Sequence, residues 1–243
     1  MAKRILVCSW LSLCLTAALA FAQYDVHYSI GLRYQYASWN TNQQYYKTLD
    51  DYNNGVLTDF DSEMSHLYGP TASINYQKFG ASITYLFGSW EFPKYPYWIW
   101  DGFNYDEDEV TETLKRADLV ITVSYRVIPR LSVFVGFKSL SLEDEVKYRD
   151  YSDFDFTVES NGSGAGGGIS GSLPLNRTLH GYATIGYMSL GGDLDTENLI
   201  LEGGFRMYFG KTPIYGSLGY RYESFDSGDT ILSGPALTLA YYH

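Results

Sequence analysis

Hydrophobic and polar residues alternate one by one along ten segments of the chain, the pattern of strands with one apolar face. In the segment 117–127, for example, Leu119, Ile121 and Val123 share one face and mainly polar residues occupy the other. About ten such residues are enough for a tilted strand to cross a bilayer. The predicted strands are 26–37, 70–77, 80–88, 117–127, 131–139, 163–173, 178–189, 198–209, 213–224 and 233–243.

The connections between these segments alternate in length. The turns near residues 78, 129, 175 and 211 are very short, whereas the connections 38–69, 88–116 and 140–162 are long. Short turns at one end and long loops at the other are expected where antiparallel strands run back and forth across a membrane.

Three of the short turns test the assignment of faces. A two-residue turn at 78–79, a three-residue turn at 128–130 and a two-residue turn at 211–212 each set one register. A slip by one residue would turn every side chain of a strand to the other face. Each turn pairs two residues that the alternation had already placed on the inner face. The pairs are Asn75 with Ser82, Arg126 with Ser132, and Glu202 with Arg221.

Residues 1–22 have the features of a secretory signal peptide. Lys3 and Arg4 precede an apolar run, and the small residues Ala20 and Ala22 close it. We expect cleavage after Ala22, an uncleaved anchor being the alternative. Both cysteines of the chain lie in this segment, so the remainder has neither a disulfide nor a thiolate metal site.

Residues 23–243 resemble bacterial outer-membrane β-barrels, and their size is similar to that of ten-stranded adhesin and omptin barrels. The last segment resembles the C-terminal assembly signal of that class: Leu237, Leu239 and Tyr241 alternate, although His243 stands where a terminal aromatic is usual. The resemblance implies an all-β fold: a closed antiparallel transmembrane β-barrel of ten strands, with eight as the alternative. It also implies an outer-membrane location. The expected partners are membrane lipid, lipopolysaccharide and, during biogenesis, the barrel-assembly machinery.

Composition agrees with a membrane barrel. The chain has 24 Tyr and 24 Gly, and Tyr suits a membrane interface because its ring is apolar and its hydroxyl is wet. The formal net charge of −11 excludes the basic footprint of a nucleic-acid-binding protein.

Charged residues on the inner face would meet in a narrow lumen. Charges in a space of low dielectric persist when they are paired or hydrated. We therefore predict an ion-pair network across the lumen and little steady conductance. Its predicted members are Arg33, Lys138, Glu202, Arg206, Arg221 and Glu223.

The long connections are rich in acidic and aromatic residues. Asp106, Asp108, Asp193 and Asp195 are candidate oxygen ligands for Ca²⁺, the alternative being a hydrated acidic rim. No other cofactor is expected. Aromatic residues are candidates for a binding surface, the alternative being a girdle at the membrane interface. They are Trp90, Tyr97, Trp98 and Trp100.

Catalytic motifs are weak. Gly162, Gly164 and Gly167 match G-x-G-x-x-G, but no Rossmann unit surrounds them. His66 is the histidine expected in an outer loop, and it has no nucleophile partner. The sequence thus favours a non-enzymatic surface protein whose loops bind ions, glycans or an extracellular partner. A small-solute channel is the alternative, and a hydrolase at the rim is the third hypothesis.

Overall fold

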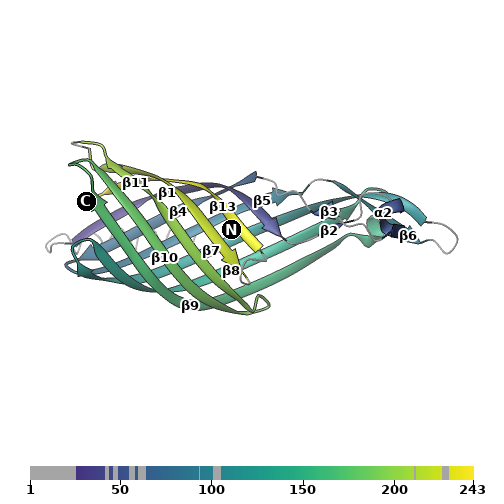
Figure 1. The fold of residues 1–243 in the computed structure, drawn as a ribbon, viewed down its shortest axis with the longest axis horizontal. Helices are drawn as coiled ribbons and strands as arrows, with labels where there is room; N and C mark the ends of the chain where they lie inside the picture. The colour runs from purple at the N-terminus through teal and green to yellow at the C-terminus, as the bar shows by residue number, and fades with distance from the viewer. Residues whose placement is uncertain are drawn as a thin grey trace, which may run out of the picture.

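A computed structural model describes residues 26–41, 44–45, 49–54, 58–59, 64–92, 94–100, 105–210, 212–225 and 230–243. The predicted signal peptide lies outside them. Ten strands form a closed antiparallel barrel in the order β5-β4-β1-β13-β12-β11-β10-β9-β8-β7, and pairing of β5 with β7 closes it (Figure 1). The predicted ten-stranded fold is confirmed over the alternative of eight.

The barrel strands are longer than most of the predicted segments. They are β1 (Val26–Thr41), β4 (Met64–Tyr76), β5 (Phe79–Glu91), β7 (Tyr105–Ile128), β8 (Leu131–Tyr148), β9 (Phe156–Pro174), β10 (Leu179–Gly192), β11 (Thr196–Tyr208), β12 (Ile214–Phe225) and β13 (Thr230–Tyr242).

Shorter elements lie in the connections. They are β2 (Gln44–Tyr45), α2 (Leu49–Asn54), β3 (Thr58–Asp59), β6 (Tyr95–Trp100) and the 3-10 turn η1 (Ser152–Phe154). Within the described ranges, no helix is long and apolar enough to cross a membrane.

The registers set by two of the predicted turns are confirmed. Glu202 pairs with Arg221 between β11 and β12, and Arg126 pairs with Ser132 between β7 and β8. The turn predicted at 78–79 is wrong by one residue. Gln77, at a left-handed φ of 54°, and Lys78 form the turn instead, which places Asn75 opposite Gly80. The faces are unchanged, because both positions of the new pair still point inward.

The predicted loops 88–116 and 140–162 are wrong in large part, because β7, β8 and β9 continue through them. Beyond the barrel these strands form a sheet with β6, which pairs with residues 105–110 of β7. We call this sheet the extension. It comprises β6, residues 105–113 of β7, 143–148 of β8 and 156–160 of β9. It projects from the end of the barrel opposite the short turns (Figure 1).

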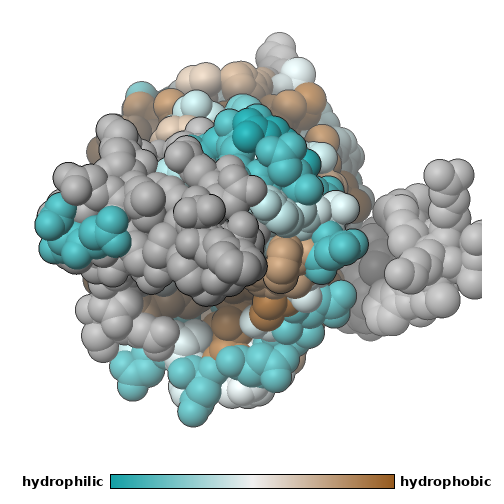
Figure 2. All heavy atoms as spheres, turned by 90° about the vertical axis from the view of Figure 1, so that its right-hand side faces the viewer, coloured by the Kyte–Doolittle hydropathy of each residue, from teal (hydrophilic) through white to brown (hydrophobic). Residues whose placement is uncertain are grey.

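The extension was missed because the apolar face of each strand changes side. Within the barrel wall of β7, Ile121 and Val123 point outward and are exposed. Further along the same strand the apolar residues Val110 and Leu114 are buried on the inner face, and Lys115 points outward. Among the coloured residues in a view from the extension end, hydrophilic groups lie toward the viewer and hydrophobic groups gather on the wall behind them (Figure 2).

Glycines on the inner face of β9 make room for large neighbours. Phe134 of β8 lies over Gly168 and Gly186, where added Cβ atoms would lie 2.6 and 3.1 Å from its ring. A Cβ on Gly164 or Gly166 would instead meet the backbone of β10 at 2.0 Å or less. Glycine is therefore a steric requirement of this wall.

Two arginine substitutions on opposite faces of β7 test which face contacts lipid. Ile121→Arg places a charge on the outer wall, and the expected loss is roughly 2–4 kcal/mol of unfolding free energy. Thr122→Arg points into a lumen cavity and should lose less. Urea unfolding in lipid vesicles measures both, and equal losses would contradict the assignment of faces.

Candidate functional site

Glu223 on β12 is the centre of a chain of buried ion pairs that crosses the lumen. Its carboxylate accepts hydrogen bonds from Arg116 of β7 at 2.6 Å, from Lys138 of β8 at 3.2 Å, and from Arg221 two residues away. Arg116 also bonds Asp118 at 2.5 Å. The Glu223, Arg116 and Lys138 side chains are at most 1% exposed, so each charge depends on its partners for solvation.

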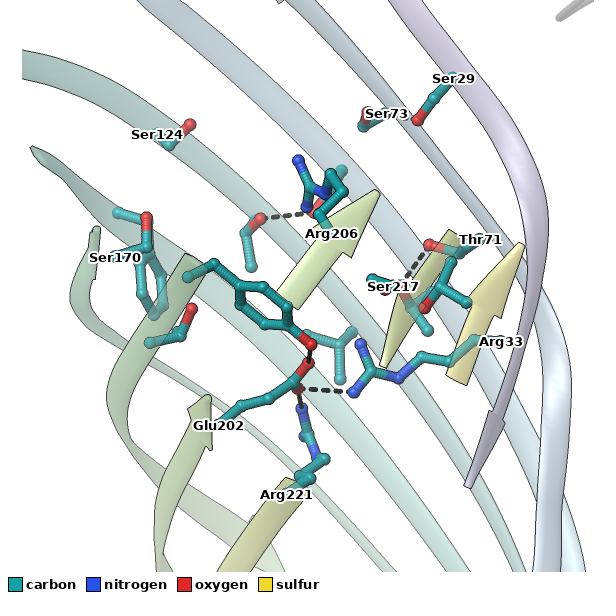
Figure 3. A pocket seen from close by; sticks show the side chains of 18 of the residues that line it. Ser29, Arg33, Thr71, Ser73, Ser124, Ser170, Glu202, Arg206, Ser217 and Arg221 are labelled. Atoms are coloured by element: carbon teal, nitrogen blue, oxygen red, sulfur yellow. Dashed lines mark hydrogen bonds and ion pairs between the residues drawn. The ribbon is translucent and has the colours of Figure 1, made fainter. Parts of the chain in front are cut away.

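Glu202 on β11 continues the chain. Arg33 of β1 lies 2.5 Å from its carboxylate, Arg221 lies 3.1 Å away, and the Tyr182 hydroxyl donates at 3.2 Å. Figure 3 shows Arg33 and Arg221 converging on Glu202 from different strands. Because Arg221 contacts both acids, it links the two halves of the chain.

The structure thus brings together five of the six predicted lumen residues and leaves Arg206 apart. Among the described residues, Arg206 has no carboxylate within ion-pair distance. Its guanidinium lies 4.9 Å from the ring centre of Tyr215 and 5.8 Å from that of Tyr182. The alternation of polar residues was enough to predict that these side chains face the lumen. It could not predict which carboxylate each cation contacts.

Sequence reasoning missed Arg116 and Asp118 as members of the network. Asp118 was placed on the inner face without a partner, and Arg116 was assigned to a loop. Extending the alternation of β7 two residues further would have placed Arg116 on the same face.

Two apolar clusters, both of which pack against Leu142, fill the lumen above the ion pairs. Arg116 lies 5.1 Å from the ring centre of Trp39, and Lys138 lies 5.1 Å from that of Phe225, so the charged layer stacks directly on these clusters. We call the two clusters together the cap. Its buried members are Ala37, Trp39, Leu67, Trp90, Phe92, Leu114, Leu232, Leu140, Leu190 and Phe225.

Trp90 does not belong to an exposed aromatic surface, contrary to the prediction. It is fully buried in the cap, and its indole N–H donates to the carbonyl of Ala37 at 3.1 Å. The reason is that β5 continues to Glu91, and the alternation of side chains along this strand turns Trp90 to the inner face. Tyr97 is 47% exposed on β6. The side chains of Trp98 and Trp100 lie outside the described part of the structure.

Four aromatic residues, of which Tyr97 and Phe154 are exposed and Tyr148 and Tyr151 half-buried, instead form a strip that runs from the extension into the connection between β8 and β9. The ring of Tyr97 lies 5.5 Å from that of Tyr148, which lies 6.1 Å from Phe154, and Phe154 lies 6.1 Å from Tyr151. We call these four residues the aromatic strip. The sequence analysis predicted Tyr97 and missed the other three residues. Had the pairing of β7 with β8 been extended beyond the barrel, it would have placed them near Tyr97.

Asp108, one of the predicted calcium ligands, does not lie in an exposed loop as that prediction assumed. It is 1% exposed and accepts hydrogen bonds from the backbone N–H groups of Glu109, Asp150 and Tyr151. The acid therefore fixes the end of β8 against β7.

Two of the other predicted ligands, Asp193 and Asp195, lie in the connection between β10 and β11. Asp193 accepts the N–H of Asn161 at 3.1 Å and, like Asp195, is exposed. The side chain of Asp106 lies outside the described residues. No group of three metal-ligating side chains is present in the part of the chain where side chains are described.

Glu112 and Asp144 form an acidic pair on the inner face of the extension. Burial and the nearby Asp144 carboxylate raise the pKa of Glu112 to about 7, although a hydrogen bond from the Tyr95 hydroxyl at 3.3 Å opposes the shift. Burial also raises the pKa of Asp144. Both shifts favour the protonated carboxyl group more than in the unfolded chain.

His66 does not lie in an outer loop as predicted. It is on the outward face of β4, where its Nδ1 lies 2.5 Å from the hydroxyl of Tyr34 and its ring lies 5.0 Å from that of Tyr36. These partners place the imidazole on the barrel wall beside aromatic residues.

No protein-family model and no curated protein matches the chain. Solved structures share its fold. The outer membrane protease OmpT from Escherichia coli is 9% identical with a TM-score of 0.50, over 89% of this chain and 97% of that one. The translocator domain of the autotransporter NalP from Neisseria meningitidis is 13% identical with a TM-score of 0.47, over 98% and 97% of the two chains.

A third solved structure is the attachment invasion locus protein Ail of Yersinia pestis, in complex with the heparin analogue sucrose octasulfate. It is 8% identical with a TM-score of 0.42, over 90% of this chain and 99% of that one. Identities this low show a likeness of fold alone. The closed sheet and its outward apolar belt decide the class. The chain has the fold of a bacterial outer-membrane β-barrel. This fold supports an outer-membrane location, whereas export through residues 1–22 stays a prediction.

Removing the central acid tests the ion-pair chain in this barrel. Glu223→Gln leaves Lys138 without a charge partner and Arg116 with Asp118 alone, and the expected loss is about 3–5 kcal/mol of unfolding free energy. Glu145→Gln removes a partly exposed partner of the exposed Lys115 and Lys147 and should cost far less. The gel shift between folded and unfolded protein, followed through urea, measures both. A similar loss in both variants would refute the central role of Glu223.

A pH titration tests the acidic pair. The unfolded carboxyl of Glu112 titrates near 4.5 and the folded one near 7, so the folded state binds more protons between these values. The extension should therefore lose stability as pH rises from about 4.5 to 7 and change little above that. Hydrogen exchange of β6 and β7, corrected for intrinsic rates, measures this. Glu112→Gln should flatten the profile, and an unchanged slope in that variant would contradict the assignment.

Proposed function

We propose that this barrel is a non-conducting, non-enzymatic membrane anchor that presents the extension outside the cell as a binding surface for a protein partner. The observation that carries the proposal is the continuity of β7, β8 and β9 from the barrel wall into the extension. A surface held by a hydrogen-bonded sheet is ordered before it binds, which lowers the entropic cost of association.

The two faces of the extension differ. The outward face carries exposed ion pairs, among them Lys115 with Glu143 and Lys147 with Glu145, which contribute little to binding because each charge already has a partner. Two members of the aromatic strip lie on the other face, because Tyr97 pairs with the inward-facing Asp108 and Tyr148 with the inward-facing Val110. Phe154 is 53% exposed. Exposed aromatic residues are frequent anchors of protein interfaces.

The edge of β9 adds apolar surface and free backbone groups. Phe156 and Val158 are 47% and 48% exposed. β9 pairs with β10 only from Gly162 onward, so residues 156–160 have β8 as their one strand partner among the described residues. An open edge of this kind can accept a strand from another chain.

Charge favours a basic partner. The chain carries a formal charge of −11, and Asp153 and Asp155 lie beside Phe154 in sequence. A basic surface with apolar side chains complements both the acids and the aromatic rings, since cations bind favourably over ring faces.

The lumen argues against the channel alternative. A solute entering from the extension end would have to displace the cap and then separate the ion pairs around Glu223. Both layers are buried and in contact, so opening them would expose charge and apolar surface together.

Binding and conductance measurements test the proposal. Proteoliposomes should bind immobilised basic proteins, and Tyr97→Ala combined with Phe154→Ala should weaken binding about tenfold, the order expected for losing about 1.4 kcal/mol. Lys147→Gln, on the outward ion-paired face, is the matched control and should bind as the unmodified protein does.

Planar bilayers supply the second measurement. The unmodified barrel should give no stable open current. A large steady conductance would favour the channel, and equal binding by the double variant and its control would remove the aromatic strip from the interface.

A further inference from the structure

Three adjoining cavities occupy the lumen between the ion-pair chain and the short turns. Their volumes are about 350, 290 and 250 Å³. Arg206 lines all three. The two smaller cavities also share His27, Asn75 and Tyr208, and the largest shares Tyr182 with one of them. The cavities thus form one hollow region around the Arg206 side chain.

The charge of this region is positive. Arg126 and Arg206 line the two smaller cavities, and no described Asp or Glu side chain does. His27, His180 and His243 also line them and contribute ring nitrogens that can form hydrogen bonds. Asp118 and Glu202 line the largest cavity, but both are already paired with arginines.

The lumen as a whole has more positive than negative charge. Below the cap, the described inward-facing side chains include three carboxylates and six cations, an excess of three positive charges. The carboxylates are Asp118, Glu202 and Glu223, and the cations are Arg33, Arg116, Arg126, Lys138, Arg206 and Arg221. This excess lies inside a chain whose net charge is −11. Positive charge held in an enclosed space requires a counter-ion or extensive hydration.

Arg206 is the cation best placed to receive that counter-ion. Its guanidinium lies over the rings of Tyr182 and Tyr215, and its Nε is buried without a hydrogen-bond partner among the described residues. In Figure 3 its side chain lies apart from the Arg33–Glu202–Arg221 group. A guanidinium has a planar set of donors that matches an oxyanion and can bind it through two hydrogen bonds.

Hydroxyl groups surround the same space. Ser29, Ser73 and Tyr215 line the cavity nearest the chain terminus, and Thr122, Ser170 and Ser217 line the largest. These groups can donate to further oxygens of a bound anion.

We propose that the lumen binds a small oxyanion of the phosphate class at Arg206, and that the anion enters from the end with the short turns. The cap closes the other end, which leaves this route. Short turns face the periplasm in barrels of this class, so the ligand is a periplasmic solute. The site is independent of the extension.

Thermal unfolding in a phosphate-free detergent tests the proposal. Inorganic phosphate is titrated at constant ionic strength, with chloride as the balancing ion. A ligand that binds the folded state raises the unfolding temperature in a saturable way. The unmodified protein should show this rise, and Arg206→Gln should weaken the apparent affinity at least tenfold. Arg126→Gln should weaken it less, because that side chain lines one cavity rather than three.

Arg177→Gln is the matched control. Arg177 is an exposed arginine at the same end of the barrel, outside all three cavities, and its loss should leave phosphate binding unchanged. A linear or absent response to phosphate in the unmodified protein would overturn the proposal. Equal losses in the Arg177 and Arg206 variants would overturn it as well, since they would indicate binding to surface charge.

Vesicles of phosphatidylglycerol separate a free anion from a lipid headgroup. The response to inorganic phosphate should be the same in these vesicles as in detergent, because Arg206 faces the lumen and not lipid. Loss of the response in vesicles alone would overturn the free anion as the occupant.

Discussion

Successive side chains of a β-strand point to opposite sides of the sheet, so the position of a residue along the strand fixes the side that it faces. A bilayer adds a second constraint: lipid offers no hydrogen bonds, so the sheet must close and leave no edge. Both constraints act on every residue of this barrel wall. They place Ile121 against lipid and Thr122 in the lumen, and they force any charged residue of the wall strands into the lumen or beyond the membrane.

The lumen therefore collects charge that must be neutralised locally. Glu223 and Glu202 do this for four cations from four strands, and the cap excludes water from one side of the arrangement. Because no single strand contains a complete set of partners, the ion-pair chain forms only when the barrel has closed. The side chains that form ion pairs in the closed barrel would each be hydrated by water in an open sheet.

Much of the barrel was predictable because its rules are local. Alternation gave the faces, and the turn near 211 gave the pairing of Glu202 with Arg221. The extension was not predicted, because outside the membrane the apolar residues of β7 move to the inner face and a search for one continuous apolar face stops there. Trp90 was misplaced for the same reason. Contacts across the lumen, such as Arg116 with Glu223, depend on the closed shape and not on neighbouring residues.

The length of β7 and β8 has a mechanical consequence. These two strands remain paired from the turn at 129–130 to Val110 and Tyr148 in the extension. A partner that pulls the extension away from the cell would load their hydrogen bonds in shear, many at once, since these bonds run perpendicular to the strands. The pulling force would then reach the barrel wall through two continuous strands rather than through a flexible tether, so the membrane would bear the load before the sheet unzipped.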